Sequence, residues 1–168
     1  MRVAVVGNAG SGKSTLSAKL AQRHDLPLHE VDRFMWNDDW SRASDDAFDA
    51  AHAAVLTQDR WILDGMGNRQ SLQRRFARAT HVIFCDLPLW QNYWLLAERQ
   101  AKWQAGRLEN PPGGRATPPS THDLFAIVWQ IDQQFMPFLR DLCTATAKEK
   151  PVIVLDRFAA VAAFDTLP

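Results

Sequence analysis

The chain has 168 residues, of which 46% are hydrophobic and 23% are charged, and 19 basic residues balance 19 acidic ones. These values exclude a disordered chain, and the zero net charge argues against duplex nucleic acid as the main partner, because such binding usually needs a basic face. No stretch reads as a membrane span or a signal peptide, so we expect one cytoplasmic domain over residues 1–168. The oligomeric state is left open.

Short apolar runs alternate with segments of helical spacing along the chain. The runs are typical of strands buried on both faces of a parallel sheet, and they cover residues 3–6, 61–64, 81–87 and 151–156, with a weaker candidate at 26–32. Helical spacing follows at Leu16 and Leu20, after a candidate N-cap at Ser44, and over residues 124–142, where Pro137 should kink the helix. The alternation predicts an α/β fold whose parallel sheet is covered by helices on both sides.

The first apolar run leads directly into "GNAGSGKS", which fits the phosphate-binding pattern G-x-x-x-x-G-K-[ST]. Glycines allow backbone N–H groups to surround phosphate oxygens, and the helix that follows adds its positive N-terminal end. Lys13 can reach the β- and γ-phosphates, and the Ser14 hydroxyl can bind Mg²⁺. The candidate nucleotide-binding residues are Gly7, Asn8, Ala9, Gly10, Ser11, Gly12, Lys13, Ser14 and Thr15.

Several classes of protein bind nucleoside triphosphates in this way. The guanine-reading N-K-x-D motif of switch GTPases is missing, and an oligomeric AAA-type ATPase would normally need a longer chain. The short chain, the early phosphate loop and a Pro/Gly-rich segment at 106–120 favour a kinase of small acceptors, with that segment as a candidate lid.

The second apolar run ends in "EVDRFMW", and Asp32 falls at the carboxyl end of this candidate strand. A carboxylate there could accept a hydrogen bond from an acceptor hydroxyl or hold a metal-bound water, because α/β proteins place ligand sites at this edge. A solvated loop or a helix cap is the alternative. Trp36 and Trp40 could wall an acceptor pocket or could simply pack the next helix onto the core.

The third run continues into "WILDGMGNR". Asp64 ends the strand where a Walker-B carboxylate would meet the water shell of Mg²⁺. Gly65 allows close backbone approach by an acceptor, and Arg69 could hold its phosphate or carboxylate bidentately. The alternative interpretation is a strand-ending turn followed by a surface arginine.

Later segments offer weaker candidates. Asp86 repeats the strand-then-Asp pattern but needs no function as a turn former before Pro88. The spacing of Trp90 and Trp94 favours core positions over a binding stripe. Mobile arginines near the lid could stabilise charge during phosphoryl transfer and exclude water, and we favour Arg99 and Arg107 over Arg115.

The stretches "GNAGSGKST", "LPLHEVDRFMW", "WILDG" and "VIFCDLP", with an Arg/Gly-containing lid, resemble the P-loop nucleoside monophosphate kinase-like proteins. The pattern is most similar to bacterial adenylate-kinase-related proteins often labelled topology modulation proteins. The resemblance runs from Val3 to about Phe164, and the D-x-x-x-W and W-I-x-D-G pair is its most diagnostic part.

This resemblance implies a three-layer α/β/α P-loop fold with a five-stranded parallel sheet. It also implies an acceptor-binding segment at about 32–60, a lid at about 103–120, and ATP with Mg²⁺. By motif match, Lys13 and Ser14 carry the phosphate and metal roles, Asp64 a metal role through water, and Arg99 and Arg107 the lid roles.

The chain also departs from that pattern. "LDGMGNR" lacks the proline of the adenylate kinase L-D-G-F-P-R, and only Arg33 and Arg42 could replace the arginine-bearing acceptor helix, which disfavours AMP as acceptor. We therefore expect an ATP·Mg-dependent kinase that transfers the γ-phosphoryl group to a small nucleotide, nucleoside or hydroxy compound. The alternative is a nucleotide-binding regulatory or DNA-associated protein with little turnover.

Overall fold

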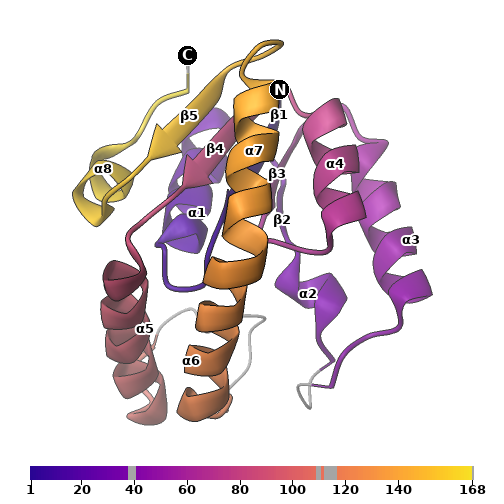
Figure 1. Cartoon of the computed structure of the whole chain (residues 1–168). Coiled ribbons are helices and arrows are strands. Elements are labelled where there is room, and N and C mark those ends of the chain that lie inside the picture. Colours follow the sequence, from indigo (N-terminus) through magenta and orange to yellow (C-terminus); the bar gives the residue numbers. More distant parts are fainter. Residues whose placement is uncertain (38–40, 109–110, 112–116, 168) are drawn as a thin grey trace.

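Five parallel strands form one sheet in the order β2-β3-β1-β4-β5 (Figure 1). The structure is a computed structural model that describes residues 1–37, 41–108, 111 and 117–167. The strands are β1 (Arg2–Gly7), β2 (Leu28–Glu30), β3 (Trp61–Asp64), β4 (His81–Cys85) and β5 (Val152–Leu155). The weakest sequence candidate, at 26–32, corresponds to the short edge strand β2, whose residues are only partly buried.

Helices cover both faces of this sheet, which confirms the predicted three-layer α/β/α fold. One face packs against α3 (Asp45–Leu56), α4 (Arg69–Arg78) and α7 (Met136–Thr146), through side chains such as Phe48, Phe76 and Leu139. The other face packs against α1 (Lys13–His24) and α8 (Phe158–Ala163). Neighbouring residues of β1 alternate between the two cores, because successive side chains of a strand point to opposite faces. The Ser44 N-cap is confirmed, since its side chain accepts a bond from the Ala47 N–H at 3.2 Å.

The predicted helix over 124–142 forms one rod, made of α6 (Thr121–Gln130), the π-helical turn η2 (Ile131–Phe135) and α7 (Figure 1). Pro137 has no N–H to donate, so the helix must break its i→i−4 pattern near this residue. The break takes the form of a π-helical turn, in which the Met136 N–H donates to the carbonyl of Ile131.

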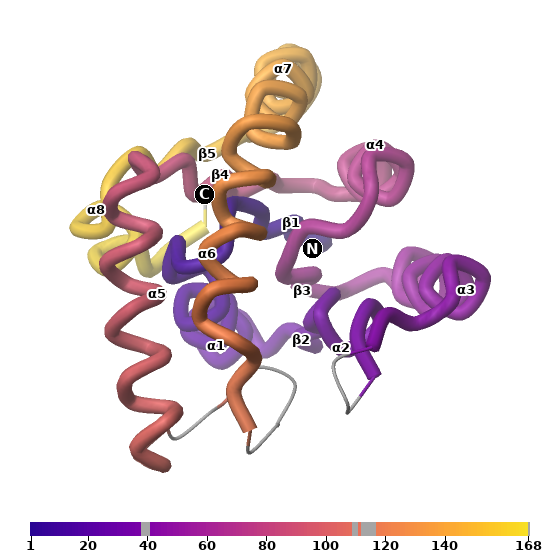
Figure 2. The backbone as a smooth tube through the Cα atoms, turned by 60° about the horizontal axis from the view of Figure 1, so that its bottom comes forward, coloured from indigo at the N-terminus to yellow at the C-terminus, as the bar shows by residue number. Residues whose placement is uncertain are grey.

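The helix α5 (Leu89–Gln104) and α6 extend side by side away from the sheet (Figure 2). The Tyr93 hydroxyl donates to the carbonyl of Phe125 at 3.3 Å and so ties the two helices together. The prediction that Trp90 and Trp94 lie in the core is wrong, because their exposed fractions are 66% and 68%. The buried stripe of α5 contains Asn92, Leu96, Gln100 and Trp103. Each tryptophan lies two positions from a stripe member, which places it on the opposite side of the helix.

The carboxyl ends of the strands meet at one edge of the sheet. In the strand register, Val5 pairs with Asp64, which in turn pairs with Glu30, while Gly7 pairs with Cys85. The short helix α2 (Asp32–Met35) begins at the same edge, directly after β2. Ligand sites of parallel α/β proteins lie at this edge, and here the fold brings the phosphate loop, Asp32 and Asp64 to it.

Candidate active site

The phosphate loop connects β1 to the first turn of α1. Its glycine at position 10 has a φ of 77°, in the left-handed region, and a Cβ at this position would lie 2.3 Å from the carbonyl oxygen of Asn92. Only glycine satisfies both conditions, so Gly10 lets the loop close onto α5. The N-cap of α1 is Gly12, which offers no capping side chain. The N–H groups of the first helical turn are therefore left for an anion.

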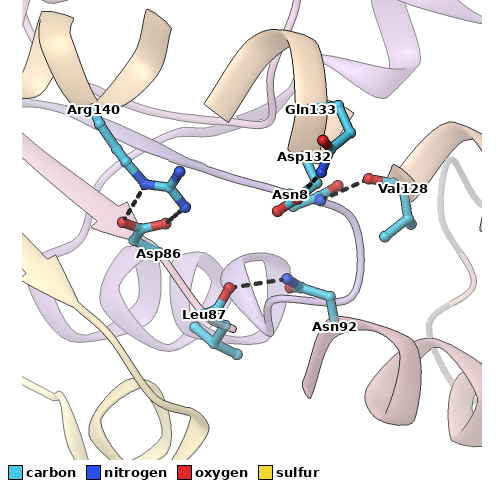
Figure 3. A network of polar contacts seen from close by, with 8 residues as sticks. All are labelled: Asn8, Asp86, Leu87, Asn92, Val128, Asp132, Gln133 and Arg140. Atoms are coloured by element: carbon cyan, nitrogen blue, oxygen red, sulfur yellow. Dashed lines mark hydrogen bonds and ion pairs between the residues drawn. The ribbon is translucent and has the colours of Figure 1, made fainter. Parts of the chain in front are cut away.

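Asn8 fixes this loop from inside (Figure 3). Its side chain is fully buried, accepts a bond from the Ala9 N–H at 2.8 Å, and donates through Nδ2 to the carbonyl of Val128 at 3.0 Å. The Nζ of Lys13 donates to the Asn8 carbonyl at 3.3 Å, so the lysine lies back across the loop. The loop is thereby joined to α6, the helix that follows the candidate lid.

Asp64 and Ser14 lie together at the centre of the edge. Asp64 is only 4% exposed, and its Oδ1 has no hydrogen-bond partner in the described part of the chain. Burial raises the pKa of Asp64 to about 6, against the opposing effects of Lys13 and of a hydrogen bond with Ser14, while Asp32 and Glu30 raise it further. A buried carboxylate with a vacant oxygen, next to a serine hydroxyl, suits a hard cation such as Mg²⁺.

The remaining metal ligands would have to come from phosphates and water. Among the described residues, no group of three or more His, Cys, Asp and Glu side chains could hold a metal ion. This donor set fits Mg²⁺, which proteins usually bind through one or two side chains together with the phosphates of a nucleotide.

Arg99 of α5 faces Asp32 across this edge. Burial lowers the pKa of Arg99, and the charge of Asp32 opposes that shift. The Nε of Arg99 is buried and has no hydrogen-bond partner among the described residues. Leu96, one turn earlier on α5, approaches the phosphate loop at Gly10. The structure therefore brings together Lys13, Ser14, Asp32, Asp64 and Arg99, five of the predicted site residues.

A small cavity of about 130 Å³ lies between the segment predicted to bind the acceptor, the loop that follows β3, and η2. Its apolar walls come from Met35, Ala43, Phe48 and Phe135, and its polar lining residues are Arg42 and Asn68 together with Gly67. The Oδ1 of Asn68 accepts from the Ser71 N–H at 2.7 Å, and Arg42 forms an exposed ion pair with Asp45 at 3.1 Å.

Gly65, Arg69 and Trp36, which are predicted to bind the acceptor, do not line this cavity. Gly65 is buried, and its N–H donates to the Val5 carbonyl at 3.1 Å, so its backbone belongs to the sheet edge. Arg69 is exposed, donates to the Gln134 carbonyl at 3.2 Å, and lies 4.9 Å from the ring centroid of Phe138. Trp36 is half-buried and bridges to Arg42 without being one of the cavity-lining residues.

The lid candidates are only partly described. Arg107 is exposed and follows the end of α5, where its N–H donates to the Lys102 carbonyl at 2.8 Å. Together with the bond from the Gly106 N–H to Trp103, this forms a Schellman motif that ends the helix. Trp40, Arg115 and the rest of residues 109–110 and 112–116, within the segment predicted as the lid, lie outside the described residues.

Asp86 has a structural partner. Both of its carboxylate oxygens accept bonds from Arg140 of α7, at 2.9 and 2.8 Å (Figure 3). This bidentate pair ties the end of β4 to the rod and raises the pKa of Arg140.

Two buried polar residues behind the acceptor cavity are not among the predicted site residues. Arg75 of α4 is fully buried and donates to the carbonyls of Gly65 and Met66, and His52 of α3 accepts its third bond. Spacing could have revealed both residues, because Arg75 lies three positions after the buried Leu72 and His52 lies four positions after Phe48.

Comparisons with known proteins agree with this architecture. Residues 2–107 match a family model described as an AAA domain, and since this is more than half of the chain, the chain belongs to that family. No match was found among curated proteins.

Solved structures of small-molecule kinases share the fold over nearly the whole chain. The shikimate kinase of Bacteroides thetaiotaomicron is 12% identical with a TM-score of 0.56, and the comparison covers 96% of this chain and 94% of that one. The shikimate kinase of Aquifex aeolicus is 13% identical with a TM-score of 0.51, over 96% and 92% of the two chains. A sugar kinase from Janibacter is 18% identical with a TM-score of 0.50, over 92% and 84%. These structural similarities show a P-loop kinase-like fold. The closer relation to topology modulation proteins stays a prediction.

In the described part of the chain, no helix is long and apolar enough to cross a membrane.

Proposed function

We propose that this protein is an ATP·Mg-dependent phosphotransferase that moves the γ-phosphoryl group of ATP to a small acceptor. The observation that carries the proposal is the vacant, buried carboxylate oxygen of Asp64 beside Ser14, at the mouth of a phosphate loop. A buried anion of this kind needs a cation, and Mg²⁺ bound with the nucleotide would supply it. The small-molecule kinases that share the fold support the same reaction class.

The phosphate side of the reaction belongs to the loop and to Lys13. The backbone N–H groups between Gly7 and Thr15 bind the β-phosphate, and Lys13 leaves the Asn8 carbonyl to reach the β- and γ-phosphates. Ser14 and Asp64 would hold Mg²⁺, and the ion would supply positive charge to balance the charge that develops on the phosphates. Arg99 donates to the equatorial oxygens of the transferring group, using N–H groups that include its unpartnered Nε.

The acceptor side belongs to Asp32 and to the cavity. Asp32 accepts the proton of the acceptor hydroxyl as the hydroxyl oxygen bonds to the γ-phosphorus of ATP. The bond between this phosphorus and the β–γ bridging oxygen breaks in the same step, and ADP leaves. The volume of about 130 Å³ supports a compact acceptor. Arg42 and Asn68 favour one with an anionic group, because the cavity lining includes no carboxylate among the described residues. Arg69 and Trp36 stand at the edge of this region and would contact a larger acceptor.

We further propose that residues 1–168 act as one P-loop kinase-like domain, with acceptor binding at about 32–60 and a lid at about 103–120. The Lys102 carbonyl of α5 accepts a bond from the Arg107 N–H and so holds Arg107 at the base of the lid. Closure of the lid would bring Arg107 to the phosphates and exclude water.

The experiment that tests this function measures ADP release from Mg·ATP in the presence of nucleoside monophosphates, nucleosides, hexoses and small hydroxy acids including shikimate. We expect one acceptor class to stimulate release, and Lys13→Ala to abolish that stimulation. Tight binding of Mg·ATP with no stimulation by any acceptor would contradict the proposal.

A second candidate is a nucleotide-dependent regulatory protein with little turnover. It is favoured by three tryptophans on α5 and α6 that are more than half exposed, since exposed aromatic side chains often mark surfaces for macromolecular partners. Their exposed fractions are 66% for Trp90, 68% for Trp94 and 53% for Trp129. Absence of acceptor-dependent turnover would favour this candidate. Nucleotide-dependent binding to DNA that weakens steeply with salt would identify its partner.

A further inference from the structure

The loop that follows Asp64 is held from behind by a single buried guanidinium. Arg75 has an exposed fraction of 0%, and it donates through Nη1 to the Gly65 carbonyl at 2.6 Å and through Nη2 to the Met66 carbonyl at 3.0 Å. Its Nε donates to the Nε2 of His52 at 3.3 Å. All three guanidinium nitrogens of Arg75 therefore donate hydrogen bonds, and two of these bonds go to the carbonyls of consecutive residues in one loop.

This arrangement is costly for the fold. Arg75 forms no ion pair with a carboxylate in the part of the chain that the structure describes. A buried cation without a paired anion loses much of its hydration, so an apolar side chain would be expected here if packing were the only requirement. His52 is suited to its acceptor role because burial and the nearby Arg75 lower its pKa to about 4, which keeps the ring neutral.

The loop held in this way also forms a wall of the acceptor cavity. Gly67 has a φ of 96°, and a Cβ there would lie 2.5 Å from the Ser71 Oγ and 3.5 Å from the Arg75 Nη2. Ser71 fixes the far end of the loop, because its hydroxyl donates to the Asn68 carbonyl at 2.8 Å and its N–H donates to the Asn68 side chain. Phe48, which lines the same cavity, stacks on His52 with ring centroids 5.8 Å apart.

We propose that Arg75 is a positioning residue for the acceptor: its guanidinium fixes the Gly65–Met66 backbone, and through it the Gly67–Asn68 wall of the acceptor cavity. This inference rests on the proposed phosphotransferase function. It assigns to α4 a part in acceptor binding through the loop, without any contact between Arg75 and the acceptor. The phosphate loop is held by the Asn8 side chain, through bonds in which Arg75 takes no part.

The test compares Arg75→Met and Arg75→Lys with the matched control Arg78→Met. Arg78 lies one turn further along α4, and its Nε donates to the carbonyl of Leu56 at 3.2 Å, away from the cavity. With the best acceptor of the panel described above, Arg75→Met should raise the acceptor KM by about tenfold or more, while the Kd of Mg·ATP stays within about twofold of the wild type. Arg75→Lys keeps the charge but loses the fork, so it should give an intermediate KM. Arg78→Met should leave both constants unchanged.

Hydrogen exchange on the Mg·ATP-loaded protein gives a readout that needs no acceptor. In Arg75→Met the amides of residues 65–68 should exchange about tenfold faster than in the wild type, with the amides of residues 7–13 unchanged. Unaltered exchange at 65–68, or an acceptor KM that matches that of Arg78→Met, overturns the inference while leaving the phosphotransferase in place. A wild-type protein that phosphorylates no member of the panel overturns the proposed function, and the positioning role with it.

Discussion

The hydroxyl of Ser14, at the start of α1, lies against the carboxylate of Asp64, at the end of β3, and hydrogen bonding between them lowers the pKa of Asp64. Burial has the larger and opposite effect, and the pKa rises to about 6. The ionised carboxylate of Asp64 is therefore unfavourable in the unliganded protein, and a bound cation would stabilise it. This relationship connects the glycine-rich loop to the rest of the sheet edge and underlies the predictions that follow.

Replacing Asp64 should raise the stability of the protein and abolish its activity. The folded pKa of about 6 lies above the ordinary value of 3.8, so the contribution of Asp64 to stability is complete below about pH 3.8 and is lost as the pH rises through about 6. Two pKa units correspond to about 3 kcal/mol. We therefore expect Asp64→Asn to be more stable than the wild type near pH 7.5, by up to this amount, and to lose phosphoryl transfer.

Chemical denaturation of both proteins between pH 4 and 8 measures the effect. The difference in unfolding free energy between Asp64→Asn and the wild type should grow with pH across this range. The titration of His52, whose pKa is lowered to about 4, is common to both proteins and cancels in the difference. A difference that does not vary with pH would contradict a raised pKa at Asp64.

Gly10→Ala should destroy the nucleotide site by a steric clash. A Cβ at position 10 would lie 2.3 Å from the Asn92 carbonyl oxygen, so either the loop or α5 must move. Gly106→Ala is the matched control, since Gly106 also has a positive φ, of 65°, but no described atom lies within 4 Å of a Cβ there. We expect a loss of Mg·ATP affinity of at least about 100-fold for Gly10→Ala, and only about 1 kcal/mol of stability loss for Gly106→Ala.

Calorimetric titration with Mg·ATP distinguishes the two variants. Equal affinities in Gly10→Ala and Gly106→Ala would show that the loop does not depend on its close approach to α5.

Arg99 and Asp32 should act as a coupled pair in catalysis. The charge of Asp32 favours protonation of the buried Arg99, so removing either residue changes the environment of the other. Arg99→Met and Asp32→Asn should each lower kcat by about 100-fold or more, and the double variant should lose much less than the product of the two single effects. Lys102→Met on the same helix, which removes an exposed ion pair with Glu98, should leave kcat unchanged. Strictly multiplicative losses would argue against coupling between the two residues.

The phosphate loop and the strands could be predicted because their signals are local. Gly7, Gly10 and Gly12 with Lys13 and Ser14 form a continuous motif, and the buried strands are continuous apolar runs. Asp32 and Asp64 were identifiable because each follows such a run, and a parallel sheet brings the carboxyl ends of its strands to one edge.

The supporting contacts could not be predicted, because they join residues far apart in the chain. Asn8 bonds to a carbonyl of α6, and Asp86 to an arginine of α7, and neither bond leaves a pattern in one sequence. Arg75 stands in the run "RRFAR", where the other two arginines, Arg74 and Arg78, are exposed, so only its place on the buried stripe of α4 distinguishes it. The four-residue spacing of Trp90 and Trp94 does not place them in the core, because the buried stripe of α5 runs through Asn92, Leu96, Gln100 and Trp103 on the other side of the helix.

The central claim is that the γ-phosphoryl group leaves ATP for a small acceptor at this site. The most direct measurement follows the label of [γ-³²P]ATP in the presence of Mg²⁺ and the acceptor panel, with Lys13→Ala and Lys19→Ala as variants. Lys19 is on the same helix, but its Nζ donates to the carbonyls of Ala162 and Phe164 and makes no bond to the phosphate loop among the described residues. We predict labelled acceptor with the wild type and Lys19→Ala and none with Lys13→Ala. Label that stays in ATP, or passes only to inorganic phosphate, would contradict the account.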